Sequence, residues 1–476
     1  MVGADADYGG ADPALPVAGP ALDSRAVTAG DVFFALAGAK DSGLRFAEAA
    51  AARGAAAIVG DVERPAELPA GIAYVRVGNA RRAVALAGAR AFPRQPKTIA
   101  AVTGTSGKTS VADFTRQIWT RAGHKAASLG TLGVVSPAGA AYGALTTPDP
   151  IALHRTLDQL AGEGVTHLCL EASSHGLDQH RLDGVRLAAG AFTNLSHDHL
   201  DYHATLAAYL DAKLRLFAEL LGRGAGAAIW VDSEAGGRVA DTAADHGLEV
   251  LGIGTSAAGI ALMERTEEGL GQRLVVQAEG RTRRLLLPLV GAFQAENALV
   301  AAGLATLTGL PAAEALESLE DLVGVPGRLE LVGHRNGAGV FVDYAHKPDA
   351  LDNALAALRP STRGRLIVVF GCGGDRDRAK RGLMGTIAST RADLVIVTDD
   401  NPRSEAPAAI RAEILARAPG AREIGDRADA IRTAVAELKD GDVLLIAGKG
   451  HETGQIIGDR TLPFSDRSVA VAALGD

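Results

Sequence analysis

Two long blocks of the chain alternate buried-strand patterns with helical patterns, and this alternation limits the folds open to it. In the middle block, apolar runs at 99–104, 167–172 and 188–195 are interspersed with helical segments at 108–123 and 205–221. Such apolar runs are typical of strands covered on both faces, and strands that alternate with helices form parallel sheets. We therefore predict a doubly wound, mostly parallel α/β sheet for this block.

The C-terminal block repeats the alternation. Its strand-like runs lie at 339–346, 365–374, 392–400 and 442–450. Each run ends in polar, charged or glycine residues, and doubly wound sheets bind ligands beyond the carboxyl ends of their strands. We therefore predict a second sheet with a ligand-binding edge.

At 476 residues the chain is long enough for about three domains. A compact α/β segment near the N-terminus ends where two prolines break the pattern, which places a boundary at 93–97. We expect residues 1–21, which are of low complexity, to be frayed. Further along, 248–290 favours strands, a helix spans about Glu296 to Thr308, and a glycine-proline turn covers 324–328.

The composition excludes several classes of protein. A formal net charge of −8 argues against a general nucleic-acid-binding protein. No apolar run reaches the ~18 residues of a membrane helix, and the first basic residue, Arg25, comes too late for a secretory signal. Cys169 and Cys372 lie in apolar runs and are too few for a disulfide framework, so we expect both to be reduced core residues. Together these features predict a cytosolic protein.

The strongest motif is TGTSGKT, Thr103 to Thr109, between a buried strand and a helix. Backbone N–H groups at a helix N-terminus bind phosphate oxygens, Lys108 adds a positive charge, and the Thr109 hydroxyl can bind Mg²⁺. Val102 stands where the general phosphate-loop pattern has its first glycine. The alternative is a glycine turn with a chance lysine, which the flanking strand and helix disfavour.

Two further motifs follow strands of the same block. In LEASSHGLDQHR, Leu170 to Arg181, Glu171 is a candidate metal ligand, although the run could also be a capped, solvated loop. In FTNLSHDHLDYH, Phe192 to His203, the histidine spacing invites a zinc interpretation, but no cysteine or HExxH helix supports it. We favour His199 as a group near magnesium or phosphate. Lys213 lies in a helical pattern, and this context alone predicts a solvent-facing side chain.

Charged residues follow three strands of the C-terminal block, within GCGGDRDRAKR, TDDNPRSE and GKGHE. Arg376 and Arg403 can pair with carboxylates in a fork geometry, while Asp400 and Glu452 can accept hydrogen bonds from an ammonium group. Both signs of charge at one sheet edge predict a zwitterionic substrate.

In order and spacing, these motifs, together with TTPDP, GAFQAENALVAA, GRLE and VDYAHKPD, resemble those of the Mur ligases over nearly the whole chain. Within that family, they are similar to the ligases that add the third peptide residue of peptidoglycan to UDP-MurNAc-L-Ala-D-Glu. The resemblance implies an α/β protein of three domains: an N-terminal UDP-binding domain (1–96), a central P-loop ATPase domain with a mostly parallel sheet (97–325) and a Rossmann-like amino-acid-binding domain (326–476).

The resemblance also implies the chemistry. ATP phosphorylates the D-glutamyl side-chain carboxylate, and the amine of the third residue attacks the acyl phosphate, because phosphate leaves far more readily than hydroxide. Mg²⁺ is the implied cofactor, ATP the co-substrate, and the other substrates are small molecules. We expect a cytoplasmic protein, a monomer, with no nucleic-acid partner and no membrane insertion.

The family motifs assign roles to individual residues. Catalysis falls to Lys108, Glu171, His199 and Lys213, the last as a carbamylated lysine, which overrides the surface expectation; Thr109, Glu171, His199 and the Lys213 carbamate are the implied metal ligands. The implied ATP-binding residues are Gly104, Thr105, Ser106, Gly107, Lys108, Thr109, Ser110, Asn297, Arg328, Asp343 and His346. The residues implied to bind the UDP-MurNAc-peptide are Leu22, Ser24, Thr146, Thr147, Ser173, Gln179 and Arg181.

For the third residue, DDNPR resembles the meso-diaminopimelate-type motif. The implied binding residues are Arg376, Asp400, Asn401, Pro402, Arg403, Gly448 and Glu452. Arg403 would pair with the distal carboxylate of diaminopimelate, which lysine lacks, so we expect diaminopimelate rather than L-lysine.

The chain departs from the family pattern at Ser106, Gln294, Ala172 and the segment 39–43, and the last of these weakens the uridine assignments. Three alternatives stay open. A folylpolyglutamate synthase relative would not be expected to carry TTPDP, DDNPR and GKGHE together. A lysine-adding ligase is opposed mainly by Arg403, and a P-loop switch or scaffold is opposed by the intact set of Lys108, Glu171, His199 and Lys213.

Overall fold

The computed structural model describes residues 6–9, 11–38, 42–66, 68, 71–141, 143, 145–199 and 201–475. These residues form two compact units, one built from residues 1–260 and 300–315 and the other from 261–299 and 316–476.

The first unit opens with a small parallel sheet whose four strands follow chain order. The strands are β1 (Pro20–Ala21), β2 (Val32–Phe34), β3 (Ala57–Gly60) and β4 (Ala73–Arg76), with helices α1 (Ala47–Ala52) and α2 (Ala80–Ala91). The expectation of a frayed start is wrong for the described part of residues 6–21. Asp7 and Arg76 exchange two backbone hydrogen bonds of 2.8 Å, and Tyr8 and Val17 pack against the apolar core of this sheet.

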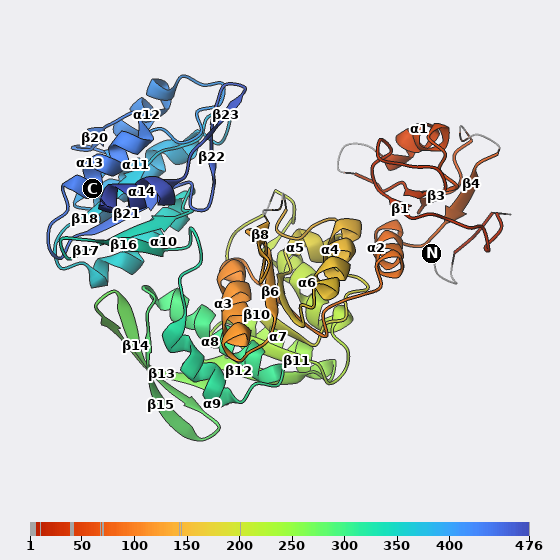
Figure 1. The fold of residues 1–476 in the computed structure, drawn as a ribbon, viewed down its shortest axis with the longest axis horizontal. Coiled ribbons are helices and arrows are strands. Elements are labelled where there is room, and N and C mark those ends of the chain that lie inside the picture. Colours follow the sequence, from red (N-terminus) through yellow and green to blue (C-terminus); the bar gives the residue numbers. More distant parts are fainter. Residues whose placement is uncertain are drawn as a thin grey trace. The chain divides into compact units, whose positions relative to one another are not determined.

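The main sheet of the first unit is parallel through six strands in the order β12-β11-β10-β5-β9-β6 and continues with antiparallel β7 and β8. Strands β6, β8, β10, β11 and β12 of this sheet are labelled in Figure 1. This order confirms the predicted doubly wound, mostly parallel sheet. The strands are β5 (Thr98–Thr103), β6 (Ala126–Gly130), β7 (Gly133–Ser136), β8 (Gly139–Ala141), β9 (His167–Glu171), β10 (Ala189–Phe192), β11 (Gly226–Trp230) and β12 (Glu249–Gly254).

Helices follow or precede these strands: α3 (Lys108–Arg121), α4 (Pro150–Gly162), α5 (Ser174–Asp178), α6 (Leu206–Arg215) and α7 (Glu234–Asp245). Of these, α3 and α6 were predicted from the sequence, whereas α4, α5 and α7 were not. The helix predicted at 205–221 changes at its C-terminal end into a π-helical turn, Leu216–Leu220. That turn keeps Leu216 and Phe217 in the same apolar core as Phe192.

The second unit begins with strands, as expected for 248–290, and with the first half of α8, whose residues 300–307 belong to the first unit, as do residues 312–315 of α9. The strands are β13 (Ile260–Glu268), β14 (Gly271–Ala278) and β15 (Arg281–Leu287). Helix α8 (Ala292–Leu307) begins four residues before the predicted start at Glu296, because Gly291, at φ +98°, lets the chain turn directly into it. Helix α9 (Ala312–Glu317) follows.

The C-terminal sheet has the order β16-β17-β21-β18-β19-β20, and all neighbours are parallel except β16 and β17. The strands are β16 (Glu330–Arg335), β17 (Ala338–Asp343), β18 (Leu366–Phe370), β19 (Leu394–Val397), β20 (Arg422–Glu423) and β21 (Val443–Ala447). The helices are α10 (Pro348–Leu358), α11 (Ala379–Arg391), α12 (Pro407–Leu415), α13 (Arg427–Ala436) and α14 (Asp466–Gly475), and β22 (Gly454–Ile457) pairs with β23 (Arg460–Pro463). Since β21 lies between β17 and β18, the motif loops that follow β17, β21, β18 and β19 meet at one edge.

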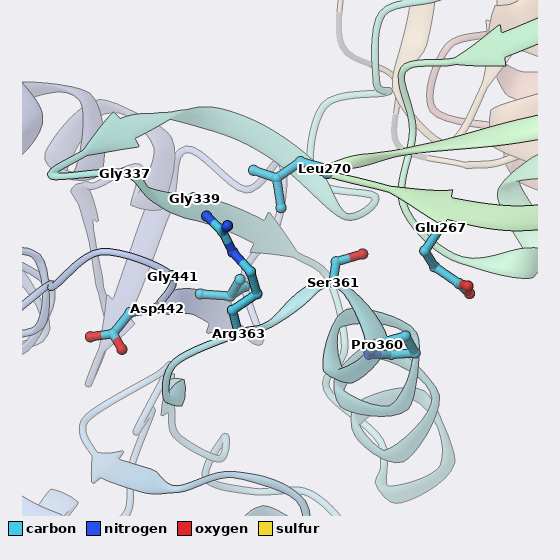
Figure 2. A pocket seen from close by; sticks show the side chains of 11 residues that line it. Glu267, Leu270, Gly337, Gly339, Pro360, Ser361, Arg363, Gly441 and Asp442 are labelled. Carbon is cyan, nitrogen blue, oxygen red and sulfur yellow. The ribbon is translucent and has the colours of Figure 1, made fainter.

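A cavity of about 370 Å³ lies at the opposite edge of this sheet, against the turn between β13 and β14 (Figure 2). Its walls include Leu270, Gly339, Ser361, Arg363 and Val443. None of its lining residues belongs to a predicted site, and apart from the β13–β14 turn the segments that supply them lie at the starts of β17, β18 and β21 rather than at their carboxyl ends.

No helix in the described ranges is both long and apolar enough to cross a membrane. Both cysteines are free and buried, as predicted.

Candidate functional site

The phosphate-loop motif occupies the turn between β5 and α3. Gly104 has φ +150° and Gly107 has φ +84°, both in the region that L side chains rarely adopt. A Cβ at position 104 would also lie 2.0 Å from Oγ1 of Thr193. Both positions therefore require glycine, and the loop delivers the chain to a helix N-terminus, whose N–H groups favour anions.

The end of β10 holds the first half of this loop. The N–H groups of Thr105 and Ser106 donate to the backbone oxygen and the Oδ1 of Asn194, at 2.9 and 3.0 Å. Oγ1 of Thr193 donates to the Ser106 carbonyl at 2.6 Å. Thr193 and Asn194 were not predicted as site residues, although both lie in the motif FTNLSHDHLDYH.

Two lysines converge on the Gly104 carbonyl. Nζ of Lys108 donates to the carbonyls of Gly104 and Thr105 at 2.9 and 2.8 Å, and Nζ of Lys213 donates to the Gly104 carbonyl at 2.7 Å. The surface position that helical context alone predicted for Lys213 is wrong, because this residue is 0% exposed. Burial, together with the charge of Lys108, lowers the pKa of Lys213 to about 6, so its amine is mostly neutral at pH 7.

Glu171 ends β9 and is only 2% exposed, which excludes the solvated-loop interpretation for this carboxylate. Its Oε1 accepts from the N–H of Thr131 at 2.7 Å, and its Oε2 accepts from the Thr131 hydroxyl at 3.3 Å. A Cβ at Gly130 would lie 2.0 Å from Oε1, so the carboxylate fills the space that a side chain at position 130 would take.

Five of the residues predicted to bind the peptide substrate lie around Glu171. Thr147 donates its hydroxyl to the Glu171 carbonyl at 2.8 Å and shares a 3.0 Å hydrogen bond with Oγ of Ser173. Arg181 donates to the Thr147 carbonyl at 2.6 Å and to Oε1 of Gln179 at 2.7 Å. The remaining member, Thr146, shares a 3.1 Å hydrogen bond with the Thr131 hydroxyl.

The two predicted uridine residues lie apart from this network, just after β1. Leu22 packs against the apolar core of the N-terminal sheet, and Ser24 is half-buried. Of the weakly assigned segment 39–43, residues 39–41 lie outside the described residues, while the N–H of Gly43 donates to the Leu36 carbonyl at 2.8 Å.

His199 adopts a positive φ of +55°, and its ring lies among other aromatic side chains. Its ring centre lies 5.0 Å from that of His175 and 6.1 Å from that of Tyr209, whose ring centre is in turn 4.1 Å from Nζ of Lys213. His175 and Tyr209 were not singled out from the sequence. Across the part of the chain that the structure describes, no group of three or more His, Cys, Asp or Glu side chains is arranged to hold a metal ion by itself.

In the second unit, the loops after β19 and β21 are joined through side chains. The amide of Asn401 donates to Oε2 of Glu452 at 3.1 Å. The ammonium of Lys449, which sequence analysis did not assign, donates to Oδ1 of Asn401 at 3.1 Å and to Oε2 of Glu452 at 2.9 Å. These loops therefore bring two of the predicted diaminopimelate residues into direct contact.

Arg403 connects the loop after β19 to the loop after β18. It has φ +53°, and its Nη1 donates to the Gly374 carbonyl at 2.9 Å. A Cβ at Gly373 would lie 2.7 Å from Nη1, so the glycines of GCGG make room for the guanidinium. Pro402 is buried beside it, whereas Arg376 is exposed on the loop after β18.

Asp400 is buried beneath these groups. Burial raises the pKa of its carboxyl, and the positive charges of Arg427 and Lys449 oppose that rise. The backbone of Gly448, at φ +120°, lies against the Asp400 carboxylate, since a Cβ at position 448 would lie 2.8 Å from Oδ2 of Asp400. Arg427 forms a fully buried bidentate pair with Asp466 and also donates to the Ala447 carbonyl at 2.9 Å.

The four remaining ATP-binding predictions also lie in the second unit. Asp343 accepts N–H groups of Leu329 and Ala345, each at 2.7 Å, and burial raises the pKa of its carboxyl. The guanidinium of Arg328 lies 5.0 Å from the ring centre of Tyr344. Nδ1 of His346 donates to the Tyr344 carbonyl at 2.9 Å, and Asn297 is buried on α8.

Three family descriptions match the chain in succession. These are the Mur ligase family catalytic domain over residues 17–95, the Mur ligase middle domain over 102–305 and the Mur ligase glutamate ligase domain over 327–450.

Curated relatives match along the whole length. A protein of Bradyrhizobium diazoefficiens named UDP-N-acetylmuramoyl-L-alanyl-D-glutamate--2,6-diaminopimelate ligase is 61% identical over 100% of this chain and 98% of its own. A protein of Mesorhizobium japonicum with the same name is 57% identical over 98% of this chain and 96% of its own.

A solved structure of a ligase with that name aligns with a TM-score of 0.74 at 32% identity, covering 97% of this chain and 95% of that one. Folylpolyglutamate synthase of Mycobacterium tuberculosis, solved with ADP, shares the fold at 19% identity and a TM-score of 0.61, over 77% of this chain and 91% of its own. The sequence identity is therefore much higher to the diaminopimelate ligases than to folylpolyglutamate synthase, and it extends over nearly the whole chain. The chain belongs to the Mur ligase family.

Proposed function

We propose that the chain is an ATP-dependent ligase that joins meso-diaminopimelate to the D-glutamyl side-chain carboxylate of UDP-MurNAc-L-Ala-D-Glu. The observation that carries this proposal is the 61% identity, over the whole chain, to a ligase named for that reaction. The proposed reaction is one step in the synthesis of the peptidoglycan precursor.

Two transfers make the amide bond. An oxygen of the D-glutamyl carboxylate attacks the γ-phosphorus of ATP, which releases ADP and leaves an acyl phosphate. The amine of diaminopimelate then attacks the acyl carbon, expels inorganic phosphate and loses a proton. We propose that the charge of Lys108 and the N–H groups at the start of α3 stabilise the phosphoryl oxygens, since such electrostatic positioning supplies most of the catalysis in phosphoryl transfer.

Magnesium fits the residues present. Mg²⁺ prefers one or two carboxylates with waters and substrate phosphates, and here a buried carboxylate, Glu171, ends a strand beside the strand that enters the phosphate loop. We propose Thr109 and Glu171 as ligands of one ion and His199 of another. When bound, the ions would neutralise the charge of the phosphoryl groups.

Lys213 is proposed to carry a carbamate. Formation of a carbamate requires a neutral amine to attack CO₂, and the buried environment lowers the pKa of Lys213 to about 6, which supplies that neutral form. Attack on CO₂ and loss of a proton would turn this neutral buried amine into an anionic carbamate, which can serve as a further metal ligand.

The other site residues keep the roles that the family motifs assign. ATP is proposed to contact Gly104, Thr105, Ser106, Gly107, Lys108, Thr109, Ser110, Asn297, Arg328, Asp343 and His346. The hydrogen-bonded group of Thr146, Thr147, Ser173, Gln179 and Arg181 is proposed to bind the muramoyl-dipeptide, and Leu22 and Ser24 the uridine.

For the incoming amino acid we propose Arg376, Asp400, Asn401, Pro402, Arg403, Gly448 and Glu452. Support comes from the hydrogen bond between Asn401 and Glu452, and from the glycine-lined position of Arg403. A guanidinium there suits the distal carboxylate of diaminopimelate, whereas L-lysine has no such group.

We further propose domains at 1–96, 97–325 and 326–476, a monomeric state and a cytoplasmic location. The three family matches, at 17–95, 102–305 and 327–450, support the division. Two buried free thiols suit a reducing compartment.

The test is phosphate release from ATP with Mg²⁺ and UDP-MurNAc-L-Ala-D-Glu, with either meso-diaminopimelate or L-lysine added. We expect release that requires diaminopimelate, with a tripeptide product by mass spectrometry. Phosphate release with L-lysine but not with diaminopimelate would show that the chain is a lysine-adding ligase. ATP hydrolysis independent of both acceptor and amino acid would contradict a ligase.

A further inference from the structure

Glu452 lies at the edge of the proposed amino-acid site, and one of its two carboxylate oxygens is already bonded. Oε2 accepts hydrogen bonds from the ammonium of Lys449, at 2.9 Å, and from the side-chain amide of Asn401, at 3.1 Å. Within the described ranges no residue donates to Oε1. One oxygen is thus held by the protein while the other is left for another donor.

Lys449 is the central member of this contact. Its side chain is 0% exposed, whereas that of Glu452 is 34% exposed. The same ammonium reaches Oδ1 of Asn401 at 3.1 Å, and that oxygen also accepts the N–H of Ile456 at 2.9 Å. Lys449 therefore lies behind the two side chains that face the site and fixes both.

The buried charges around Lys449 explain why a cation is needed there. Asp400 and Asp466 lie in the same interior, and Arg427 is already committed to Asp466 through a bidentate pair. The charge of Glu452 adds to the rise in the pKa of Asp400 that burial causes, and the charge of Lys449 opposes it together with that of Arg427, so Lys449 offsets the repulsion between the two carboxylates.

We propose that Lys449 is a positioning residue for the incoming amino acid, holding Oε2 of Glu452 and the amide of Asn401 so that Oε1 of Glu452 can accept an ammonium group of diaminopimelate. This inference rests on the proposed function. It assigns Lys449 no contact with the substrate, since its ammonium is buried and bonded within the protein.

The test is a double-mutant cycle of Lys449→Met and Glu452→Gln, measured in the full chain as the KM for meso-diaminopimelate. Lys449→Met removes the charge with little change in shape. We expect each single variant to raise that KM by about tenfold or more, because one partner of a buried, hydrogen-bonded charge pair is lost. The double variant should be no worse than the poorer single variant, since residues that act through one contact are not additive.

Controls separate this role from a structural one. KM for ATP and for UDP-MurNAc-L-Ala-D-Glu should stay within about twofold in Lys449→Met, and Lys439→Met, an exposed lysine of the same domain, should match the unmodified chain. If Lys449→Met does not fold, Lys449→Gln keeps a donor without the charge and should show the same KM effect in weaker form.

Two outcomes would overturn the proposal. Effects of Lys449→Met and Glu452→Gln that multiply would show that Lys449 does not act through Glu452. A lower KM in Lys449→Met would show that Lys449 competes with the substrate for Glu452. Failure of the proposed function is distinguishable from both, because the unmodified chain would then form no tripeptide with diaminopimelate in the same assay.

Discussion

The Nζ atom of Lys213 lies 2.7 Å from the carbonyl oxygen of Gly104, so a helix 109 residues downstream donates to the first residue of the phosphate loop. The contact is buried, and it carries no partner of opposite charge among the described hydrogen bonds and ion pairs of Lys213. Burial therefore lowers the pKa of the amine to about 6 from its ordinary value of 10.5.

The first prediction concerns stability and pH. Between pH 6 and about 10, Lys213 is neutral in the folded chain and protonated in the unfolded chain, so unfolding takes up a proton. The free energy of unfolding should therefore rise with pH, relative to Lys213→Met, by about 1.4 kcal/mol per pH unit. Urea unfolding in CO₂-free buffer at pH 7 and 8.5 measures the difference, and equal slopes for both proteins would contradict the neutral amine.

The second prediction concerns Lys108. Lys108→Met should lower kcat by about 100- to 1,000-fold, because it removes a fixed positive charge from the proposed phosphoryl site. Phosphate release under saturating substrates measures the effect. Lys97→Met, an exposed lysine one residue before β5, is the matched control and should keep normal activity. Near-normal turnover in Lys108→Met would refute the phosphate role.

The third prediction concerns Arg403. Arg403→Ala should weaken the use of diaminopimelate by roughly 2–5 kcal/mol in kcat/KM, since the distal carboxylate would be left without its cation. KM for ATP should not change. Arg391→Ala, which removes an exposed arginine paired with Asp352 in the same domain, serves as control. An unchanged KM for diaminopimelate in Arg403→Ala would remove the basis for preferring it over lysine.

The fourth prediction concerns Gly130. Gly130→Ala places a Cβ 2.0 Å from Oε1 of Glu171, which must displace the carboxylate. A misplacement of about 1 Å can cost about 100-fold in rate, so kcat should fall by that order while the chain still folds. Gly237→Ala on α7, where a Cβ meets open space, should leave kcat unchanged. Equal activity of the two variants would show that the position of Glu171 is unimportant.

The fifth prediction concerns the buried pair of Arg427 and Asp466. Arg427→Met should destabilise the chain by about 3–5 kcal/mol, because it leaves an uncompensated buried carboxylate. The double variant Arg427→Met/Asp466→Leu should recover most of that loss. Urea unfolding of the three proteins provides the comparison, and a double variant as unstable as the single would contradict the charge explanation.

Local patterns were enough to predict strands such as β5, β9 and β10 and the loops that follow them, but not β6 or β11. Apolar runs such as 167–172 define a buried strand, and the polar residues at its end define where a ligand edge lies, so Glu171 and Lys108 could be found from the sequence. Partners distant in the chain could not. Nothing in a helical context distinguishes the buried Lys213 from an exposed lysine, and only the family resemblance corrected that prediction.

Other differences have equally specific causes. The N-terminal segment looks frayed because Ala, Gly and Pro give no periodicity, yet a pairing of Asp7 with Arg76, 69 residues away, anchors it. The role of Lys449 was missed because its burial depends on loops from two strands separated by 45 residues, which only the sheet order β21-β18-β19 brings together.

The hold of Asn194 on Thr105 and Ser106 has a consequence for the entropy of nucleotide binding. With two of its amides already committed to the end of β10, the first half of the loop has little conformational freedom left to lose when a nucleotide arrives. The conformational entropy of this part of the loop is lost when the main sheet folds, not when the nucleotide binds. Any ligand that binds the start of α3 therefore encounters a rigid receptor, and its affinity should depend on the phosphates it presents rather than on its ability to reshape the loop.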